Sequence, residues 1–156
     1  MKKIIILIPV FNDWKSLIKL IDEINENIKD YKNIDFDCLV VNDASTMDRP
    51  KLIKPNNIKL LKILNMKENR GHARCNAFGI RYIFENIDFD NLILMDGDGE
   101  DRPVEIKYLV DEVIKNPDIS VVAKRIKRSA IKYLILDSND ISIGGYSNEL
   151  LQKVSS

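Results

Sequence analysis

Short apolar runs alternate with amphipathic segments along most of this chain, and this alternation restricts its fold more than any other feature. The apolar runs are rich in branched residues, as buried strands are, and they occupy residues 3–8, 36–41, 58–64, 91–95 and 119–123. Apolar residues spaced three and four apart predict helices over residues 14–28, 72–86 and 103–116. Strands that alternate with helices predict an α/β domain, in which a mostly parallel sheet carries helices on both faces.

The even charge balance narrows the range of partners. Of the 156 residues, 24 are Lys or Arg and 24 are Asp or Glu, so the formal net charge is zero and no overall field attracts nucleic acid or a membrane. We therefore expect no nucleic-acid partner. The length suits a single domain, and a hydrophobic fraction of 45% is usual for a globular protein.

The N-terminal segment looks like a signal peptide, because two lysines precede a short apolar run. No cleavage site of small residues follows, however, and the next segment is charged and periodic. No apolar run approaches the roughly 20 residues that span a bilayer. Cys38 and Cys75 fall inside a predicted strand and a predicted helix, so no disulfide framework is expected. These features predict a cytoplasmic protein, in which the basic run at residues 124–132 would allow peripheral contact with the inner face of the membrane.

Polar clusters follow the ends of four predicted strands. "PVFND" follows the first strand, "NDASTMD" the second, "DGDGED" the fourth and "KRIKR" the fifth. Parallel strands end at one edge of a sheet, and ligands bind in the crevice at that edge. The four clusters are therefore predicted to converge on one site. Within the first cluster, Asn12 or Asp13 is placed to cap the helix that follows.

The segment "DGDGED" is the strongest candidate for chemistry, because its closely spaced carboxylates would repel one another without a cation. An EF-hand loop that opens at Asp96 needs glycine at its sixth position and glutamate at its twelfth. Asp101 and Lys107 stand at these positions, so calcium binding of that kind is excluded. A solvated Asp-Gly turn is the structural alternative.

The remaining interpretation of this segment is a site for Mg²⁺ or Mn²⁺. Such hard cations take one or two carboxylates and complete their shell with substrate phosphates. Gly97 and Gly99 carry no side chain, so a bulky anion could approach the backbone there. The candidate metal ligands are Asp96, Asp98 and Glu100.

Two further features suit a phosphate-bearing ligand, and each has an ordinary alternative. Asp43 could accept hydrogen bonds from a nucleobase imide, or could cap the turn that contains Ser45 and Thr46. Arg125 could neutralise a diphosphate or belong to a solvated basic face. The glycine motifs of Walker-type ATPases and of dinucleotide-binding folds do not occur in the chain.

Four motifs in order resemble those of the family 2 glycosyltransferases with the GT-A fold: "IPVFND", "VVNDASTMD", "NRGHARCNAFGI" and "LILMDGDGEDRP". The subgroup that they resemble most is the polyprenyl-phosphate (dolichyl-phosphate) mannose or glucose synthase type, in which an acid-x-acid loop leads into a helix that begins with proline. The resemblance covers residues 3 to 128 and rests on the order and spacing of the motifs. It implies a Rossmann-like GT-A sheet.

The resemblance also implies an activity, a cofactor and a set of site residues. A sugar would be transferred, with inversion, from a UDP- or GDP-linked donor to a polyprenyl-phosphate or saccharide acceptor in cell-envelope or glycan biosynthesis. Asp96, Asp98 and Glu100 would hold Mg²⁺ or Mn²⁺, and Asp96 and Asp98 would be the catalytic residues. The nucleotide would be bound by Pro9, Phe11, Asp13, Val41, Asp43, Gly97 and Arg125, of which Arg125 would contact phosphate.

The same resemblance predicts how the chain is organised. Residues 1–128 are expected to form the nucleotide-sugar-binding GT-A domain, and residues 129–156 a short remnant of the acceptor-side region, as though the chain were truncated. One alternative is a catalytically incomplete protein that binds the donor without transferring sugar. Another is a receiver or flavodoxin-like module, which is disfavoured because Pro9 and Val10 stand where a receiver domain has paired acids.

Overall fold

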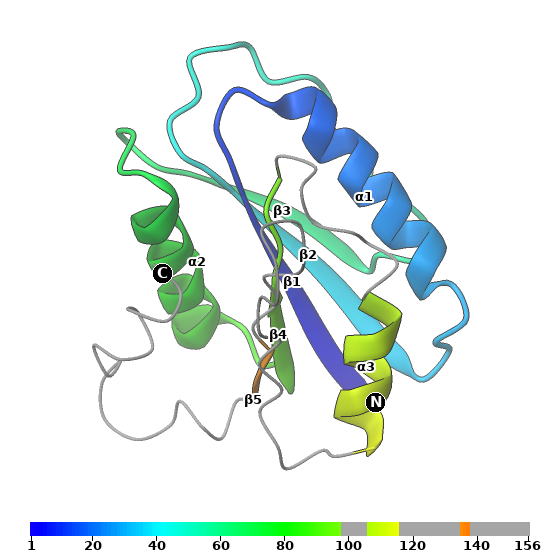
Figure 1. Ribbon diagram of the computed structural model, residues 1–156. Helices are drawn as coiled ribbons and strands as arrows, with labels where there is room; N and C mark the ends of the chain where they lie inside the picture. Colours follow the sequence, from blue (N-terminus) through cyan, green and yellow to red (C-terminus); the bar gives the residue numbers. More distant parts are fainter. Residues whose placement is uncertain (98–105, 116–134, 138–156) are drawn as a thin grey trace, which may run out of the picture.

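A five-stranded sheet lies at the centre of the computed structural model, which describes residues 1–97, 106–115 and 135–137 (Figure 1). The order of the strands across the sheet is β3-β2-β1-β4-β5. Their bounds are β1 (Lys2–Val10), β2 (Ile34–Asn42), β3 (Leu60–Asn65), β4 (Asn91–Leu94) and β5 (Ile135–Asp137).

The central position of β1 follows from its composition. Every residue from Ile4 to Val10 is buried, a pattern typical of strands that are covered on both faces of a parallel sheet. β1 pairs in parallel with β2 and with β4, and β2 pairs in parallel with β3. Only β5, at the edge of the described sheet, pairs in antiparallel, with β4. The first four strands therefore present their carboxyl ends at one edge.

The strand order separates the predicted fold from its alternative. In the Rossmann order, β1 lies between β2 and β4, as it does here, whereas in the flavodoxin-like order it lies between β2 and β3. The receiver or flavodoxin-like interpretation is therefore wrong, because the second crossover leads outward past β2 instead of back past β1. The prediction of a mostly parallel α/β sheet is confirmed.

Helices cover both faces of the sheet, as predicted (Figure 1). On one face, α1 (Trp14–Ile28) and α3 (Ile106–Lys115) pack in a core cluster with Ile4, Ile6 and Ile8 of β1. On the other face, α2 (His72–Asn86) packs in a second cluster with Ile5 and Leu7. The alternation of β1 side chains between the two clusters is the two-residue period of a strand. None of the helices in the described part of the chain is long and apolar enough to cross a bilayer.

The predicted bounds of the first two helices, 14–28 and 72–86, agree with the structure because each helix start carries a local signal. The side chain of Asp13 accepts a hydrogen bond from the backbone N–H of Ser16 (3.3 Å) and so caps α1. Gly71 precedes α2 with a positive φ of 85°, a conformation that suits glycine.

Strand bounds agree less closely with the prediction. β3 begins at Leu60, two residues after the start of the predicted apolar run, although Ile58 is fully buried. β5 is a strand that the apolar pattern does not predict. The predicted strand at 119–123 and the predicted first turn of the third helix lie outside the described residues.

Candidate functional site

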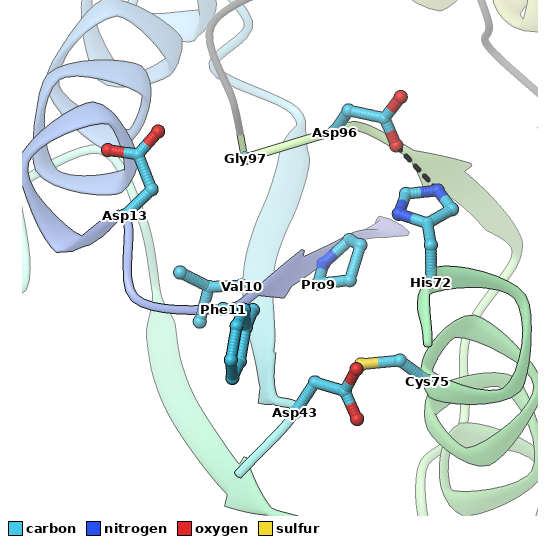
Figure 2. Close-up of a pocket in the computed structure, with 9 residues that line it drawn as sticks. All are labelled: Pro9, Val10, Phe11, Asp13, Asp43, His72, Cys75, Asp96 and Gly97. Atoms are coloured by element: carbon cyan, nitrogen blue, oxygen red, sulfur yellow. Dashed lines mark ion pairs between the residues drawn. The ribbon is translucent and has the colours of Figure 1, made fainter. Parts of the chain in front are cut away.

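A pocket opens at the carboxyl edge of the sheet, where β1, β2 and β4 end (Figure 2). Three of the four polar clusters contribute to it, as expected for ligand sites in such sheets. The fourth cluster, at residues 124–128, lies outside the described residues. The residues that line the pocket are Pro9, Val10, Phe11, Asp13, Asp43, His72, Cys75, Asp96 and Gly97.

The turn after β1 brings Phe11 and Asp13 to the pocket. Asn12, between them, has a positive φ of 59°, which asparagine tolerates better than most residues. Its Oδ1 atom accepts hydrogen bonds from the backbone N–H groups of Thr46 (2.8 Å) and Met47 (2.9 Å). Of the two predicted helix caps, Asp13 is therefore the cap, and Asn12 holds the loop after β2 against the turn after β1.

Asp43 extends from the end of β2 and is 4% exposed. Its carboxylate accepts hydrogen bonds from two backbone N–H groups of the loop before α2, Arg70 to Oδ1 (2.9 Å) and Gly71 to Oδ2 (3.0 Å). The turn after β2 is capped by Asn42 instead, which accepts the N–H of Ser45 (3.0 Å). The capping role considered for Asp43 is thus excluded. Carboxylate oxygens have further lone pairs, so contact with a nucleobase stays a prediction.

Asp96, two residues after the end of β4, faces His72 at the start of α2. The Nε2 atom of His72 lies 2.8 Å from Oδ1 of Asp96, and the two side chains are 47% and 16% exposed, respectively. Figure 2 shows this pair on one side of the pocket, with Asp43 on the other side and Phe11 next to Asp43. The pair therefore connects the loop after β4 to the start of α2.

Close packing against β1 gives Gly97 a structural reason to be glycine. A Cβ atom at this position would lie 2.8 Å from the backbone carbonyl oxygen of Pro9 and 3.2 Å from the Ile8 side chain. The missing side chain thus lets the loop after β4 pack closely against β1, and the approach of an anion to this backbone stays a prediction. A side chain at this position would push the loop after β4 away from the end of β1.

Cys75 forms part of the pocket wall from α2. Burial, with a smaller contribution from the carboxylate of Asp43, raises the pKa of its thiol to about 12. The thiol therefore stays protonated at neutral pH and is no nucleophile. Its Sγ atom donates to the carbonyl oxygen of Val41 (3.5 Å). Cys38 packs in the core cluster on the opposite face of the sheet, so the two cysteines cannot pair.

The structure brings together most of the predicted site residues that it describes. Val41 is the exception, because its side chain is fully buried in the core cluster beneath α2 and does not line the pocket. Asp98, Glu100 and Arg125 lie outside the described residues. The predicted residues that do line the pocket are Pro9, Phe11, Asp13, Asp43, Asp96 and Gly97.

Three pocket residues are missing from the sequence prediction. Val10 follows Pro9 within the first motif, so its position alone could have indicated it. His72 and Cys75 face the pocket from the first turn of α2, because α2 starts beside the ends of β1 and β4. The motif around Gly71 marks this helix start, but only the packing of α2 on the sheet decides which of its side chains reach the pocket.

The donor set of the pocket suits a hard cation in part. Among residues 1–97, 106–115 and 135–137, no three His, Cys, Asp or Glu side chains form a metal-binding group. Asp96 supplies one carboxylate on the pocket wall, and Mg²⁺ sites use one or two carboxylates with substrate phosphates. The described residues therefore fit a metal that shares its shell with a bound diphosphate.

Two solved structures with similar folds superpose on this chain. A mannosyltransferase, PcManGT from Pyrobaculum calidifontis in complex with GDP-Man and Mn²⁺, superposes with a TM-score of 0.54 and 15% identity, over 94% of this chain and 48% of that one. S. aureus TarS 1-349 in complex with UDP superposes with a TM-score of 0.50 and 14% identity, over 82% of this chain and 38% of that one. The strand order, the site at the carboxyl edge and these likenesses define a GT-A fold.

The family follows from the sequence match. The chain belongs to glycosyl transferase family 2, because the model of that family matches residues 5–152. The uncharacterized protein MJ0544 of Methanocaldococcus jannaschii is 27% identical over 113 residues, which are 70% of this chain and 46% of that protein. The chain thus spans less than half the length of each of these relatives. The predicted resemblance to family 2 glycosyltransferases is confirmed.

Proposed function

We propose that this chain is a nucleotide-sugar glycosyltransferase domain. It binds a UDP- or GDP-linked sugar with Mg²⁺ or Mn²⁺ in the pocket and transfers the sugar, with inversion, to an acceptor. The bond between the anomeric carbon and the diphosphate breaks, a bond from that carbon to an acceptor oxygen forms, and the nucleoside diphosphate leaves. Family membership supports this activity, and the GDP-Man and UDP bound by the two structural neighbours support the donor class.

The observation that carries the proposal is the placement of two carboxylates on opposite sides of one pocket. Asp43 and Asp96 both line it, and the half-exposed ring of Phe11 lies on the Asp43 side (Figure 2). A nucleoside diphosphate has the matching polarity, since the base offers N–H donors and a planar face, whereas the diphosphate needs a cation to approach a carboxylate. We assign the base to the Asp43 side and the diphosphate to the Asp96 side.

A metal bound on the Asp96 side would supply positive charge to the leaving diphosphate. We propose Asp98 and Glu100 as its further protein ligands and Arg125 as a contact to phosphate. Pro9, Phe11 and Asp13 would then line the nucleoside end, with Asp96 and Asp98 as the residues nearest the reacting bond.

The proposed acceptor is a polyprenyl phosphate, as in the subgroup that the motifs resemble, and a saccharide is the second candidate. A phosphate acceptor is already an anion at neutral pH and needs no general base, whereas a saccharide hydroxyl does. A lipid acceptor would place the reaction at the inner face of the membrane, with the domain on the cytoplasmic side.

Calorimetric titration of the full chain tests the donor site. We expect either UDP or GDP to bind in the presence of Mn²⁺. Without Mn²⁺ the nucleotide should bind at least about ten-fold more weakly, which is the size of effect that follows when groups around a metal site are removed. We expect Asp96→Asn and Asp98→Asn to weaken nucleotide binding in the presence of Mn²⁺ to the same extent, because each variant removes a negatively charged ligand of the cation. Transfer of the sugar from the matching sugar nucleotide to a short-chain polyprenyl phosphate tests whether the chain belongs to the polyprenyl-phosphate sugar synthase subgroup.

A matched control is Asp88→Asn, which makes the same chemical change at an exposed acid outside the pocket. This variant should bind the nucleotide as the unmodified chain does. The proposal would be contradicted if neither nucleotide bound with Mn²⁺, or if Asp88→Asn weakened binding as much as the two site variants. Binding without any transfer would favour the catalytically incomplete alternative.

A further inference from the structure

We propose that His72 is a positioning residue for Asp96, the carboxylate assigned to the metal. We also propose that His72 connects the base-binding side of the pocket to the metal-binding side. The inference rests on the proposed function, because it assigns Asp96 to the metal. His72 lies within the motif "NRGHARCNAFGI" but is not among the predicted site residues. The basis of the inference is a chain of contacts from Asp43, through the loop before α2, to Asp96.

The first contact is between His72 and Asp96. The distance of 2.8 Å between Nε2 and Oδ1 is that of a hydrogen bond from a ring N–H to a carboxylate. The second carboxylate oxygen of Asp96 points away from the imidazole in Figure 2. Oδ1 is therefore taken by His72, and Oδ2 would be the oxygen available to hold a cation. A carboxylate held in this way has one orientation ready for the cation.

The second contact restrains the imidazole from the side of α2. The amide of Asn76, one helical turn after His72, lies 3.1 Å from the same Nε2 atom. Because the Nε2 proton is assigned to Asp96, this is a packing contact and not a second hydrogen bond. Asn76 is 3% exposed, so its position is defined by the packing of α2 on the sheet. The imidazole is thus restrained although nearly half of its surface is exposed.

The third contact links His72 to the base-binding side. Asp43 accepts the backbone N–H groups of Arg70 (2.9 Å) and Gly71 (3.0 Å), which are the two residues immediately before His72. Hydrogen bonds to a charged acceptor are among the stronger ones in proteins. A nucleotide that moved the Asp43 carboxylate would therefore move the start of α2, and with it the partner of Asp96.

Groups that hydrogen-bond a ligating carboxylate typically change metal affinity 10- to 100-fold when they are removed. We expect His72→Ala to weaken Mn²⁺ binding about ten-fold in the presence of the nucleotide that the chain binds, measured by electron paramagnetic resonance of free and bound Mn²⁺. His72→Gln keeps an N–H donor of similar reach and should recover most of the affinity. Nucleotide affinity measured without metal should change by less than about two-fold in both variants, since the base-binding side is intact.

Glu85→Ala, an exposed change near the other end of α2, serves as the control and should bind Mn²⁺ as the unmodified chain does. Thermal unfolding of all four proteins shows whether each variant folds. Equal Mn²⁺ affinity in the unmodified chain and in His72→Ala, or equal loss in His72→Ala and His72→Gln, would overturn the positioning role alone. Absence of Mn²⁺ binding by the unmodified chain with either nucleotide would overturn the proposed function, and this inference with it.

Discussion

At the scale of single residues, the two thiols are protected by burial, Cys38 within β2 and Cys75 on the face of α2 that packs on the sheet. Burial, with a smaller effect of Asp37, raises the pKa of Cys38 to about 12, and burial with a smaller effect of Asp43 raises that of Cys75 to about 12. The reactive thiolate is therefore scarce at pH 8. We expect iodoacetamide to leave both cysteines unmodified in the native chain, as measured by mass spectrometry.

The reference is the chain unfolded in guanidinium, in which iodoacetamide should alkylate both thiols over the same reaction time. Rapid modification of Cys75 in the native chain would show that α2 opens at the pocket wall. Protection of Cys75 by a bound nucleotide would in that case report on the site directly.

Asp43 shows what a residue's type can and cannot predict. A carboxylate at the end of a parallel strand indicates a ligand site, and Asp43 does line the pocket. Its described hydrogen-bond partners, the N–H groups of Arg70 and Gly71, belong to a loop that follows the next strand. Local sequence cannot select between a cap and a long-range contact, because either satisfies the same oxygens.

At the scale of elements, the close approach of α2 to the sheet depends on Gly79. A Cβ atom at this position would lie 2.6 Å from Cδ1 of Leu7 and 2.9 Å from Cγ2 of Val41. Overpacking of this kind costs about 1–3 kcal/mol, whereas alanine gains about 1 kcal/mol of helix propensity over glycine. The difference is about 0–2 kcal/mol, so we expect Gly79→Ala to lower the free energy of unfolding by up to about 2 kcal/mol in urea titrations.

Leu7→Val provides the matching second change, since valine lacks the δ-carbons that the new methyl group would meet. The double variant should be more stable than the sum of the two single changes predicts, by at least about 0.5 kcal/mol, as for residues in contact. Strict additivity would mean that α2 shifts as a whole and that Leu7 is not the obstacle.

At the scale of the whole molecule, Tyr31 ties the connection between α1 and β2 to α3. Its hydroxyl donates to the Asp111 carboxylate (2.9 Å) and lies 3.2 Å from the carbonyl oxygen of Lys107. Burial, followed by the hydrogen bond to Asp111 and the charges of Asp111 and Asp30, raises the pKa of Tyr31 from 10.0 to about 12. The folded chain therefore retains this proton at pH values where the unfolded chain releases it.

The sign of the pH dependence follows from this raised pKa. The contribution of Tyr31 to stability is complete below pH 10 and is lost as the pH rises toward about 12, where the phenolate would face Asp111. We expect the free energy of unfolding to fall less steeply between pH 10 and 12 in Tyr31→Phe than in the unmodified chain. Absorbance of the phenolate at alkaline pH checks the titration itself, and equal slopes in the two proteins would contradict the prediction.

The elements were predictable because their signals are local. The helical spacing of α1, with Asp13 as its cap, and the continuous burial of β1 follow from neighbouring residues alone. β5 was not predictable in this way, since three residues carry no period and β5 pairs with β4, far away in the sequence. The bounds of β3 shifted for a related reason, because pairing with β2, and not hydrophobicity, decides where a strand begins.

The sequence by itself determined the alternation of strands and helices, the polar clusters at strand ends and the family, because each depends on residue type and spacing along the chain. The tertiary structure alone decided the contacts across the site. His72 meets Asp96, and Asp43 holds the loop before α2, only because β1 lies between β2 and β4 and α2 packs across the face beside them. Contacts between separate elements depend on strand order and packing, and no local pattern records either.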